Sequence, residues 1–288
     1  MIVDAHHHLW DTSHRTYPFL GAETMTPVRR PYTVDDLRAV TGGRVDRTVL
    51  VQTVGDVDET AEFLAAAHGS DGLIAGVVGW VDLTAPDVAE RIARLRELPG
   101  GDRLVGIRHQ VQDEPDLRWL DRPEVRRGIR AVGAAGLAYD LLVLTPQLPS
   151  ARSVAEDLPE IRFVLDHLAK PGIAGQQWDP WDAGISALGA LPNVTAKLSG
   201  LVTEARWDGW KPDDFRRYAD HALLVFGPDR LMFGSDWPVC LLAAGYGEVF
   251  DLAQELTAGL DAAERAAVFG GTAVRTYQLP EPPGAIAP

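Results

Sequence analysis

Short apolar runs recur along the chain, separated by longer segments in which apolar and polar residues are mixed. A run of about four to eight apolar residues that does not alternate with polar ones is typical of a strand buried on both faces. These runs predict about eight strands. They lie near residues 2–8, 48–54, 74–81, 104–109, 137–144, 162–167, 193–199 and 231–236.

The segments between these runs carry signals for helices. Thr33, Thr84 and Asp121 each precede an amphipathic segment and are predicted to cap the helix that follows. Because a helix is predicted between successive strands, the strands are expected to run parallel. About eight such units predict a (β/α)8 TIM barrel with a C-terminal helical extension. No GxGxxG motif follows the first strand, which disfavours a Rossmann fold.

The chain of 288 residues is predicted to form one domain. The barrel is expected to span residues 1–279, and the Pro-rich segment 280–288 is expected to form a flexible tail. Residues 10–32 make a long connection after the first strand, and we expect this connection to fold over the mouth of the barrel.

The composition narrows the classes of partner. A formal net charge of -14 and a pI near 4.9 disfavour nucleic-acid and anionic-membrane partners, since those surfaces are negative and attract basic proteins. The chain has one cysteine, Cys240, and neither a signal peptide nor a long apolar span is visible. We therefore expect a cytoplasmic protein that acts on a small molecule, with its oligomeric state left open.

Polar and aromatic residues stand at the ends of the predicted strands, where the catalytic groups of a barrel enzyme lie. Successive side chains of a strand point to opposite faces, so His6 and His8 are predicted to point into the mouth together, and His7 away from it. The strand ends carry His6 and His8, Gln52, Trp80, Arg108 and His109, Asp166 and His167, Lys197 and Ser199, and Asp236 and Trp237.

The histidine pair of the first strand predicts a metal site. His6 and His8 are two residues apart, and His167 or Asp236 would supply further ligands, with water in an open position. The alternative is that these histidines are hydrogen-bonded packing residues. Their place at the end of the first barrel strand favours the functional interpretation.

Five motifs occur in order along nearly the whole chain: DAHHHLW, GIRHQVQ, VLDHLAKP, AKLSGL and MFGSDWP. With these motifs the chain resembles the amidohydrolase superfamily, and within it the amidohydrolase-2 group of sugar-acid lactonases. That group includes lactonases for L-fucono- and L-rhamnono-lactone, with 2-pyrone-4,6-dicarboxylate lactonase as a more distant relative. The resemblance implies a hydrolase of carbohydrate metabolism that opens the ring of an aldonolactone by base-activated water.

The resemblance also implies roles for individual residues. His6, His8, His167 and Asp236 match the metal ligands, and Asp236 matches the general base. In two-metal members of the superfamily, a lysine or glutamate bridges the two ions. The fourth strand of this chain has Arg108 and His109 instead, which argues against a two-metal centre. We expect one divalent ion, and nitrogen-rich ligands with one carboxylate favour zinc. Similar lactonases include metal-free examples, so operation without a metal stays open.

Lactone hydrolysis needs an activated water, a stabilised carbonyl oxygen and a proton for the leaving alkoxide. Asp236 is the predicted base that activates the water. The imidazoles of His6 and His8 are predicted to polarise the carbonyl, either through the metal or directly. His167 or His109 is predicted to assist or to donate the proton.

Further residues are expected to bind the substrate. Arg108 and Lys197 would hold hydroxyls or a carboxylate, although both also suit a role as partners of nearby acids such as Asp140 or Asp166. Aromatic rings near the mouth would stack on a sugar ring or serve as packing. The remaining expected substrate contacts are Gln52, Trp80 and Trp237.

Two other functions fit the same residues. Metal-dependent decarboxylases of the amidohydrolase-2 group share the first-strand histidines and the eighth-strand aspartate, so release of carbon dioxide would identify that activity. A catalytically silent sugar-acid binding barrel is the other alternative. The joint presence of His6, His8, His167 and Asp236 argues against it.

Overall fold

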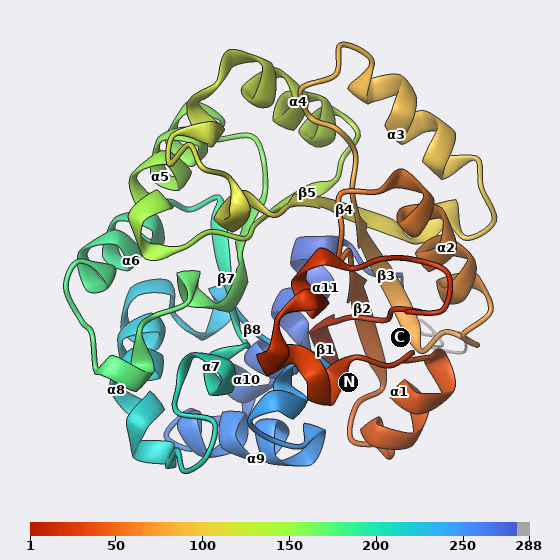
Figure 1. The fold of residues 1–288 in the computed structure, drawn as a ribbon. Coiled ribbons are helices and arrows are strands. Elements are labelled where there is room, and N and C mark those ends of the chain that lie inside the picture. Colours follow the sequence, from red (N-terminus) through yellow and green to blue (C-terminus); the bar gives the residue numbers. More distant parts are fainter. Residues whose placement is uncertain (281–288) are drawn as a thin grey trace.

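A computed structural model describes residues 1–280 of the chain, and a barrel of eight strands forms its centre. The strands are all parallel and follow one another around the sheet in sequence order (Figure 1). The predicted (β/α)8 TIM barrel is therefore confirmed. The strands are β1 (Val3–His7), β2 (Arg47–Val51), β3 (Ile74–Gly79), β4 (Leu104–His109), β5 (Ala138–Leu141), β6 (Phe163–Leu165), β7 (Val194–Leu198) and β8 (Leu231–Phe233).

The barrel closes between β1 and the residues that follow β8. The backbone N–H of His8 donates to the carbonyl O of Trp237 at 2.6 Å, and the backbone N–H of Asp236 donates to the carbonyl O of His6 at 2.8 Å. These bonds bring the ends of the first and last strands together. They also bring His6 close to Asp236, although the two residues lie at opposite ends of the chain.

Helices surround the barrel, as Figure 1 shows. Three of them follow the last strand, and the last two, α10 and α11, correspond to the predicted C-terminal extension. The helices are α1 (Val34–Thr41), α2 (Val57–His68), α3 (Val88–Arg96), α4 (Pro123–Ala134), α5 (Leu148–Asp157), α6 (Trp181–Gly189), α7 (Leu201–Glu204), α8 (Pro212–Phe226), α9 (Tyr246–Leu256), α10 (Ala262–Ala266) and α11 (Thr272–Tyr277).

Only one of the three predicted helix caps is confirmed. Thr33 caps α1 with a reciprocal capping box. The hydroxyl of Thr84 donates instead to Asp82 at 2.6 Å, and α3 begins four residues later. The carboxylate of Asp121 binds Arg126 at 2.7 Å, and the residue after Asp121 precedes α4. In both cases the helix begins further along the chain than predicted, so that Asp87 and Arg122 stand at the N-cap positions instead.

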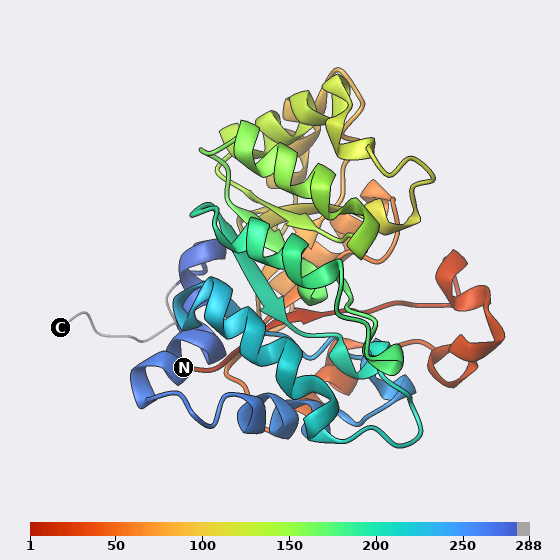
Figure 2. The same ribbon diagram turned by 90° about the vertical axis from the view of Figure 1, so that its left-hand side faces the viewer.

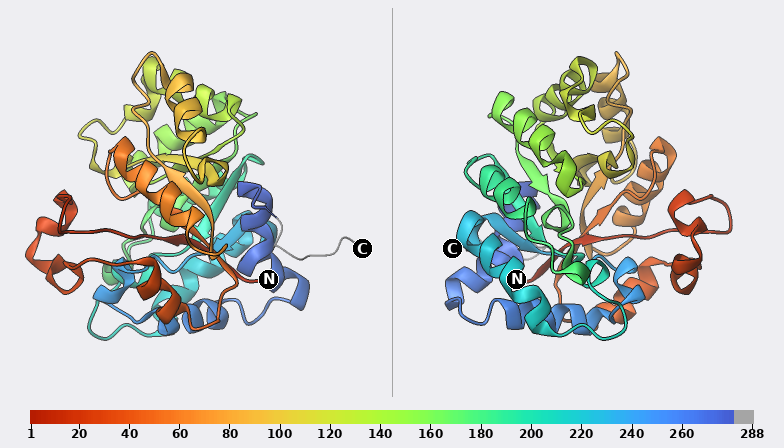
Figure 3. Two further views of the ribbon diagram at one scale, coloured as in Figure 1. Left: turned by 90° about the vertical axis from the view of Figure 1, so that its right-hand side faces the viewer. Right: turned by 60° about the vertical axis from the view of Figure 1, so that its left-hand side comes forward.

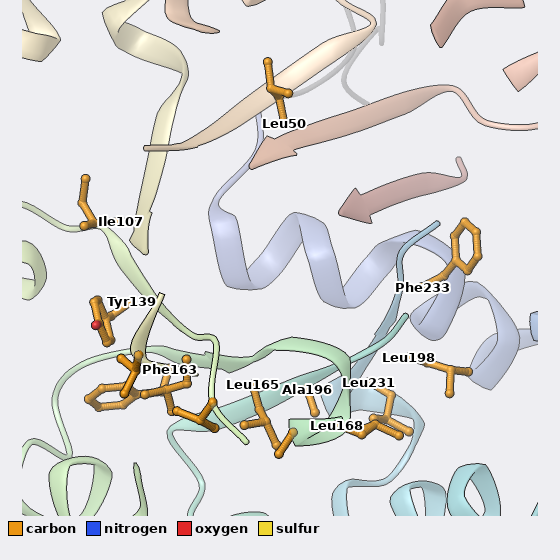
Figure 4. Packing of buried hydrophobic residues seen from close by; sticks show 14 of the residues in the cluster. Leu50, Ile107, Tyr139, Phe163, Leu165, Leu168, Ala196, Leu198, Leu231 and Phe233 are labelled. Carbon is orange, nitrogen blue, oxygen red and sulfur yellow. The ribbon is translucent and has the colours of Figure 1, made fainter. Parts of the chain in front are cut away.

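Apolar side chains of the strands form two separate layers. The outer layer lies between strands and helices, and Figure 4 shows Leu50, Phe163 and Leu231 pointing away from the ring of strands. Burial of each such side chain stabilises the fold by about 1.5–3 kcal/mol. The inner layer includes Tyr277 of α11, whose hydroxyl donates to Asp140 at 2.6 Å. Tyr277 thus lies at the boundary between the apolar part of the barrel interior and the part that holds buried charged residues such as Asp140.

The connection of residues 10–32 extends from the end of the barrel at which the strands finish (Figures 2 and 3). Trp10 packs edge-to-face on Tyr32 with ring centroids 5.3 Å apart, and Tyr32 packs on Trp237 in the same way at 5.2 Å. Phe19 of this connection lines the cavity described below. The connection therefore lies at the mouth of the barrel, as predicted, and forms part of the cavity wall.

All strands except β4 end before their predicted ends, and the difference matters most at β6 and β8. β6 ends at Leu165 and β8 at Phe233, two or three residues before the predicted ends. After β6 the backbone of residues 167–170 turns into the left-handed region, and Asp236 adopts a φ of +56° after β8. The residues expected at these strand ends therefore lie in turns, which direct their side chains toward the mouth.

The tail predicted at 280–288 falls, from residue 281 onward, outside the residues that the structure describes. Among residues 1–280, no helix has the length and apolar character needed to cross a membrane. The described chain is thus a barrel with its surrounding helices and the connection that extends from its mouth (Figure 1).

Candidate active site

A cavity of about 290 Å³ lies at the ends of the strands. Its position agrees with the rule that catalytic groups of such barrels stand at the carboxyl ends of the strands. The first connection contributes apolar side chains to its wall. Its lining includes Phe19, Met25, His8, Arg108, His167 and Asp236.

Three histidine side chains converge on the carboxylate of Asp236. Its Oδ1 atom lies 3.4 Å from Nε2 of His8, 3.7 Å from Nε2 of His6 and 3.8 Å from Nε2 of His167. All four side chains are buried. Residues from β1, from the turn after β6 and from the turn after β8 therefore meet at one point.

Hydrogen bonds behind the imidazoles fix their orientation. His8 Nδ1 lies 2.7 Å from the carbonyl O of Val51, so Nδ1 carries the proton and Nε2 keeps a lone pair. His6 Nε2 lies 3.1 Å from His8 Nε2. His167 Nδ1 lies 2.9 Å from Oγ of Ser199, which leaves its Nε2 facing Asp236.

An irregularity in β1 turns His6 toward the interior of the barrel. The pairing register with β2 shifts between Asp4 and His7, and the Asp4 carboxylate accepts the backbone N–H of His6 at 3.1 Å. His7 points the other way, and its Nε2 lies 2.9 Å from Oγ1 of Thr48. The prediction that His6 and His8 share a face while His7 does not is confirmed.

A buried network of ion pairs lies behind His6. Lys197 Nζ lies 2.6 Å from Asp140 Oδ2, 2.9 Å from Asp166 Oδ1 and 3.1 Å from His6 Nδ1. Arg108 Nη1 donates to Asp166 Oδ2 at 2.8 Å. The two cations balance the two carboxylates, which satisfies the requirement that buried charges be paired.

Burial changes the protonation of the groups around Asp236. It lowers the pKa of His167 to about 4 and the pKa of His6 well below its usual value, so both imidazoles are neutral at neutral pH. Burial alone would raise the pKa of Asp236, but at acid pH the protonated imidazoles of His167 and His8 attract the carboxylate, which outweighs burial and keeps that pKa below its usual value. Asp236 is therefore an ionised carboxylate among histidines, as a general base must be.

The donor set fits a single divalent metal ion. His6, His167 and Asp236 each offer a ligand atom, and these atoms lie within 4.8 Å of one another. Bonds of about 2.0–2.1 Å to zinc place tetrahedral ligands about 3.3 Å apart. The separations of 3.4–3.8 Å between Asp236 Oδ1 and the three Nε2 atoms are close to that value. The fourth candidate ligand, His8, thus also has the right place.

Two of the predicted substrate contacts lie behind the cavity. Lys197 is 0% exposed, and its Nζ lies 2.6 Å from Asp140 and 2.9 Å from Asp166, so it acts as the partner of buried acids. Gln52 is also 0% exposed, and its Oε1 accepts from Arg108 at 3.1 Å. Gln52 therefore supports Arg108, which does line the cavity.

His109, Trp80 and Trp237 lie apart from the cluster. Trp80 Nε1 donates to His109 Nδ1 at 3.1 Å, so His109 Nε2 carries the proton and donates to Glu114 at 2.8 Å. The His109 ring also stacks on Trp119. With both nitrogens engaged, His109 has no proton to give to a ligand. Trp237 is 0% exposed and packs as a core residue.

The cavity also contains polar residues that we did not predict. Lys170 is the one for which the sequence held a signal, because it stands three residues after His167 in VLDHLAKP. Side chains three residues apart lie on the same side of a 3-10 turn. The others occur in connections without a regular period and are Thr53, Gln110, Gln112, Asp113, Thr203 and Glu204.

A (β/α)8 barrel with histidines at the ends of its first and sixth strands and an aspartate after its eighth defines the amidohydrolase class of barrel enzymes. The family model described as Amidohydrolase matches residues 3–279, and the chain belongs to this family. The resemblance seen in the five motifs is thereby confirmed.

Relatives of known name cover nearly the whole chain. It is 44% identical to L-fucono-1,5-lactonase of Burkholderia multivorans over 97% of both chains. It is 37% identical to L-fucono-1,5-lactonase of Burkholderia ambifaria over 98% of this chain and 97% of that one. The crystal structure of a Burkholderia multivorans amidohydrolase with bound zinc matches with a TM-score of 0.90 at 43% identity, covering 97% of this chain and 100% of that one.

Replacement of His7 is expected to flatten the dependence of stability on pH. Burial lowers the pKa of His7 to about 3, whereas an unfolded histidine titrates near 6.5. The unfolded chain therefore binds a proton that the folded one does not, and His7 removes stability as the pH falls from 6.5 toward 3. Between pH 7 and pH 5 this loss amounts to about 2 kcal/mol.

Urea unfolding of the wild type and of His7→Gln at these two pH values measures the effect. Gln keeps a polar group for Thr48 but does not titrate. The unfolding free energy of the variant is expected to fall by about 2 kcal/mol less than that of the wild type. Parallel pH profiles for the two proteins would contradict the assignment.

Loss of the Lys197 charge is expected to destabilise the fold strongly. Lys197→Met leaves two buried carboxylates with one cation, and breaking a buried pair in this way costs about 3–5 kcal/mol. The double variant Lys197→Met/Asp140→Asn should recover part of that loss, because it removes the unpaired charge. Urea unfolding compares both with the exposed control Lys211→Met. A loss below about 1 kcal/mol in Lys197→Met would contradict the role of the network.

Proposed function

We propose that this protein hydrolyses the lactone of a sugar acid, an aldonolactone of the L-fucono-1,5-lactone type. The observation that carries the proposal is the ionised Asp236, whose Oδ1 lies 3.4–3.8 Å from three imidazole nitrogens beside a cavity. The 44% identity to an L-fucono-1,5-lactonase supports the choice of substrate class. The cavity's size of about 290 Å³ suits a single sugar ring.

The first chemical step adds water to the carbonyl carbon of the lactone. The Asp236 carboxylate accepts a proton from the water, and the water oxygen forms the new bond to carbon. The π-electron pair of the carbonyl moves onto its oxygen, which becomes an oxyanion. The low pKa of Asp236 keeps the carboxylate ready for this step at neutral pH.

The second step opens the ring. The electron pair on the oxyanion re-forms the carbonyl, and the bond between that carbon and the ring oxygen breaks. The leaving oxygen takes the proton that Asp236 holds, which restores the base. Asp236 thus moves one proton from water to the alkoxide, and His109, whose nitrogens are both engaged, is not needed as a donor.

The histidines orient these reactants. His8 binds the carbonyl O of Val51 through Nδ1, so the lone pair on its Nε2 faces Asp236. The Nε2 atom of His167 also faces Asp236. We propose that His6, His8, His167 and Asp236 hold a divalent ion, and that this ion is zinc. When bound, zinc would polarise the lactone carbonyl and increase the acidity of the attacking water.

Replacement of Asp236 by Asn is expected to lower kcat/KM by about 10²–10⁴-fold, because Asn cannot accept the proton of water. Hydrolysis of aldonolactones, followed with a pH indicator, measures the rate. Asp251→Asn, at an exposed position on α9, is the matched control and should match the wild type. Wild-type rates in Asp236→Asn would refute the assignment, and release of carbon dioxide by the wild type would indicate a decarboxylase instead.

Zinc binding is expected to depend on the histidines that face Asp236 and not on their neighbour. The wild type and His7→Gln should each retain about one zinc per chain after dialysis, whereas His8→Asn and His167→Asn should retain much less. Elemental analysis of the dialysed proteins gives this ratio independently of activity. Equal zinc content in all four proteins would refute the proposed ligands.

A further inference from the structure

Four consecutive residues after β6 adopt the left-handed backbone conformation, and none of them is glycine. The angle φ is +53° at His167, +50° at Leu168, +57° at Ala169 and +52° at Lys170. This conformation is unfavourable for a residue with a Cβ, so a run of four persists only where the surrounding structure holds it. Strain of this kind is concentrated at functional sites, so the side chains that this turn holds in place are candidates for a functional role.

The turn is held by its apolar middle and presents its polar ends to the cavity. Leu168 and Ala169 are fully buried, and Trp181 Nε1 donates to the carbonyl O of Leu168 at 2.7 Å. The backbone N–H of Lys170 donates to the carbonyl O of His167 at 2.9 Å. Side chains at the two ends of such a turn lie on the same side. His167 and Lys170 accordingly both line the cavity.

The ammonium group of Lys170 has no direct ion-pair partner in the part of the chain that the structure describes, although its charge acts on Glu204 and Asp236, which also line the cavity. Within residues 1–280 its side chain makes neither an ion pair nor a hydrogen bond, although it is half-buried. Arg108, the other lysine or arginine of the lining, is already paired with Asp166 at 2.8 Å. Lys170 therefore brings to the cavity a positive charge that no direct contact holds, beside the carboxylates of Asp236 and Glu204.

We propose that Lys170 is a catalytic residue that binds the carbonyl oxygen of the lactone and, after ring opening, the carboxylate of the product. This inference rests on the proposed lactonase function. An ammonium group whose hydrogen-bond donors are all free can donate to an oxygen atom on which negative charge develops, and so stabilise it. The paired guanidinium of Arg108 offers less, because Asp166 already neutralises it.

The lactone carbonyl oxygen gains negative charge, loses it and becomes part of a carboxylate during the reaction, and Lys170 binds it at each stage. As the water oxygen bonds to the carbonyl carbon, the π-electron pair moves onto the carbonyl oxygen, and Lys170 donates a hydrogen bond to the anion. When the ring C–O bond breaks, that pair returns to the carbonyl and the bond pair leaves on the ring oxygen. The ring oxygen takes the proton from Asp236, and the product acid ionises to a carboxylate that Lys170 still binds.

Two variants at position 170 test the proposal. Lys170→Met removes the charge and Lys170→Arg keeps it, and neither replacement adds backbone strain beyond that of lysine. Lys211→Met, at an exposed position before α8, is the matched control. For L-fucono-1,5-lactone we expect Lys170→Met to lower kcat by about 10²–10³-fold with little change in KM. Lys170→Arg should retain more of the activity, and the control should match the wild type.

Binding of open-chain L-fuconate, measured by calorimetry, gives a readout that needs no turnover. Lys170→Met is expected to bind this carboxylate at least about 10-fold more weakly than the wild type. Thermal unfolding of both proteins confirms that they are folded. An unchanged kcat or an unchanged affinity for L-fuconate would overturn the proposal. A rise in KM alone would also overturn it, because that pattern indicates equal binding of ground and transition states.

The two proposals fail in distinguishable ways. If the wild type hydrolyses no aldonolactone, the proposed function is wrong, and the calorimetry still decides the role of Lys170 as a carboxylate ligand. Binding of L-fuconate that depends on Lys170 would support that role. Binding that ignores the substitution, or no binding to the wild type, would overturn it.

Discussion

The ammonium group of Lys197 is the constraint on which the rest of the site depends. It is 0% exposed and lies between Asp140 and Asp166, and a charge at such a position without partners would cost several kcal/mol. Its pairing ties together three neighbouring strands of the barrel, through Asp140 of β5, Asp166 after β6 and Lys197 of β7. Asp166 also holds Arg108, and Lys197 itself contacts His6. The same charges that stabilise the interior therefore set the position of the first imidazole.

Departures from regular strand geometry then direct the remaining side chains to one point. The register shift in β1 at Asp4 turns His6 inward, and left-handed backbone at His167 and Asp236 turns their side chains toward it. Gly200 is part of the same arrangement, since a Cβ there would lie only 2.5 Å from the His167 ring. The unfavourable conformations persist because the apolar layers around the barrel hold them.

The sequence predicts what depends on local periodicity and fails where partners come from distant strands. Apolar runs locate the strands, and alternation places His6 and His8 on one face, because both are properties of a single segment. Alternation along a strand does not show how far a side chain lies from the mouth of the barrel. It therefore could not distinguish Arg108, which lines the cavity, from Lys197, which is buried behind it. The pairing of Trp80 with His109 likewise joins side chains from different strands.

The contacts of His6 allow two positions for its ring proton, and only one of them leaves a nitrogen free to bind a metal ion. Its Nδ1 faces a donor, Lys197 Nζ at 3.1 Å, and an acceptor, Asp166 Oδ1 at 3.4 Å. If Nδ1 accepts from Lys197, the ring proton sits on Nε2 and is donated to His8. If Nδ1 donates to Asp166, Nε2 keeps a lone pair that can bind a metal ion. Moving one proton between the two ring nitrogens exchanges these arrangements while every side chain stays in place.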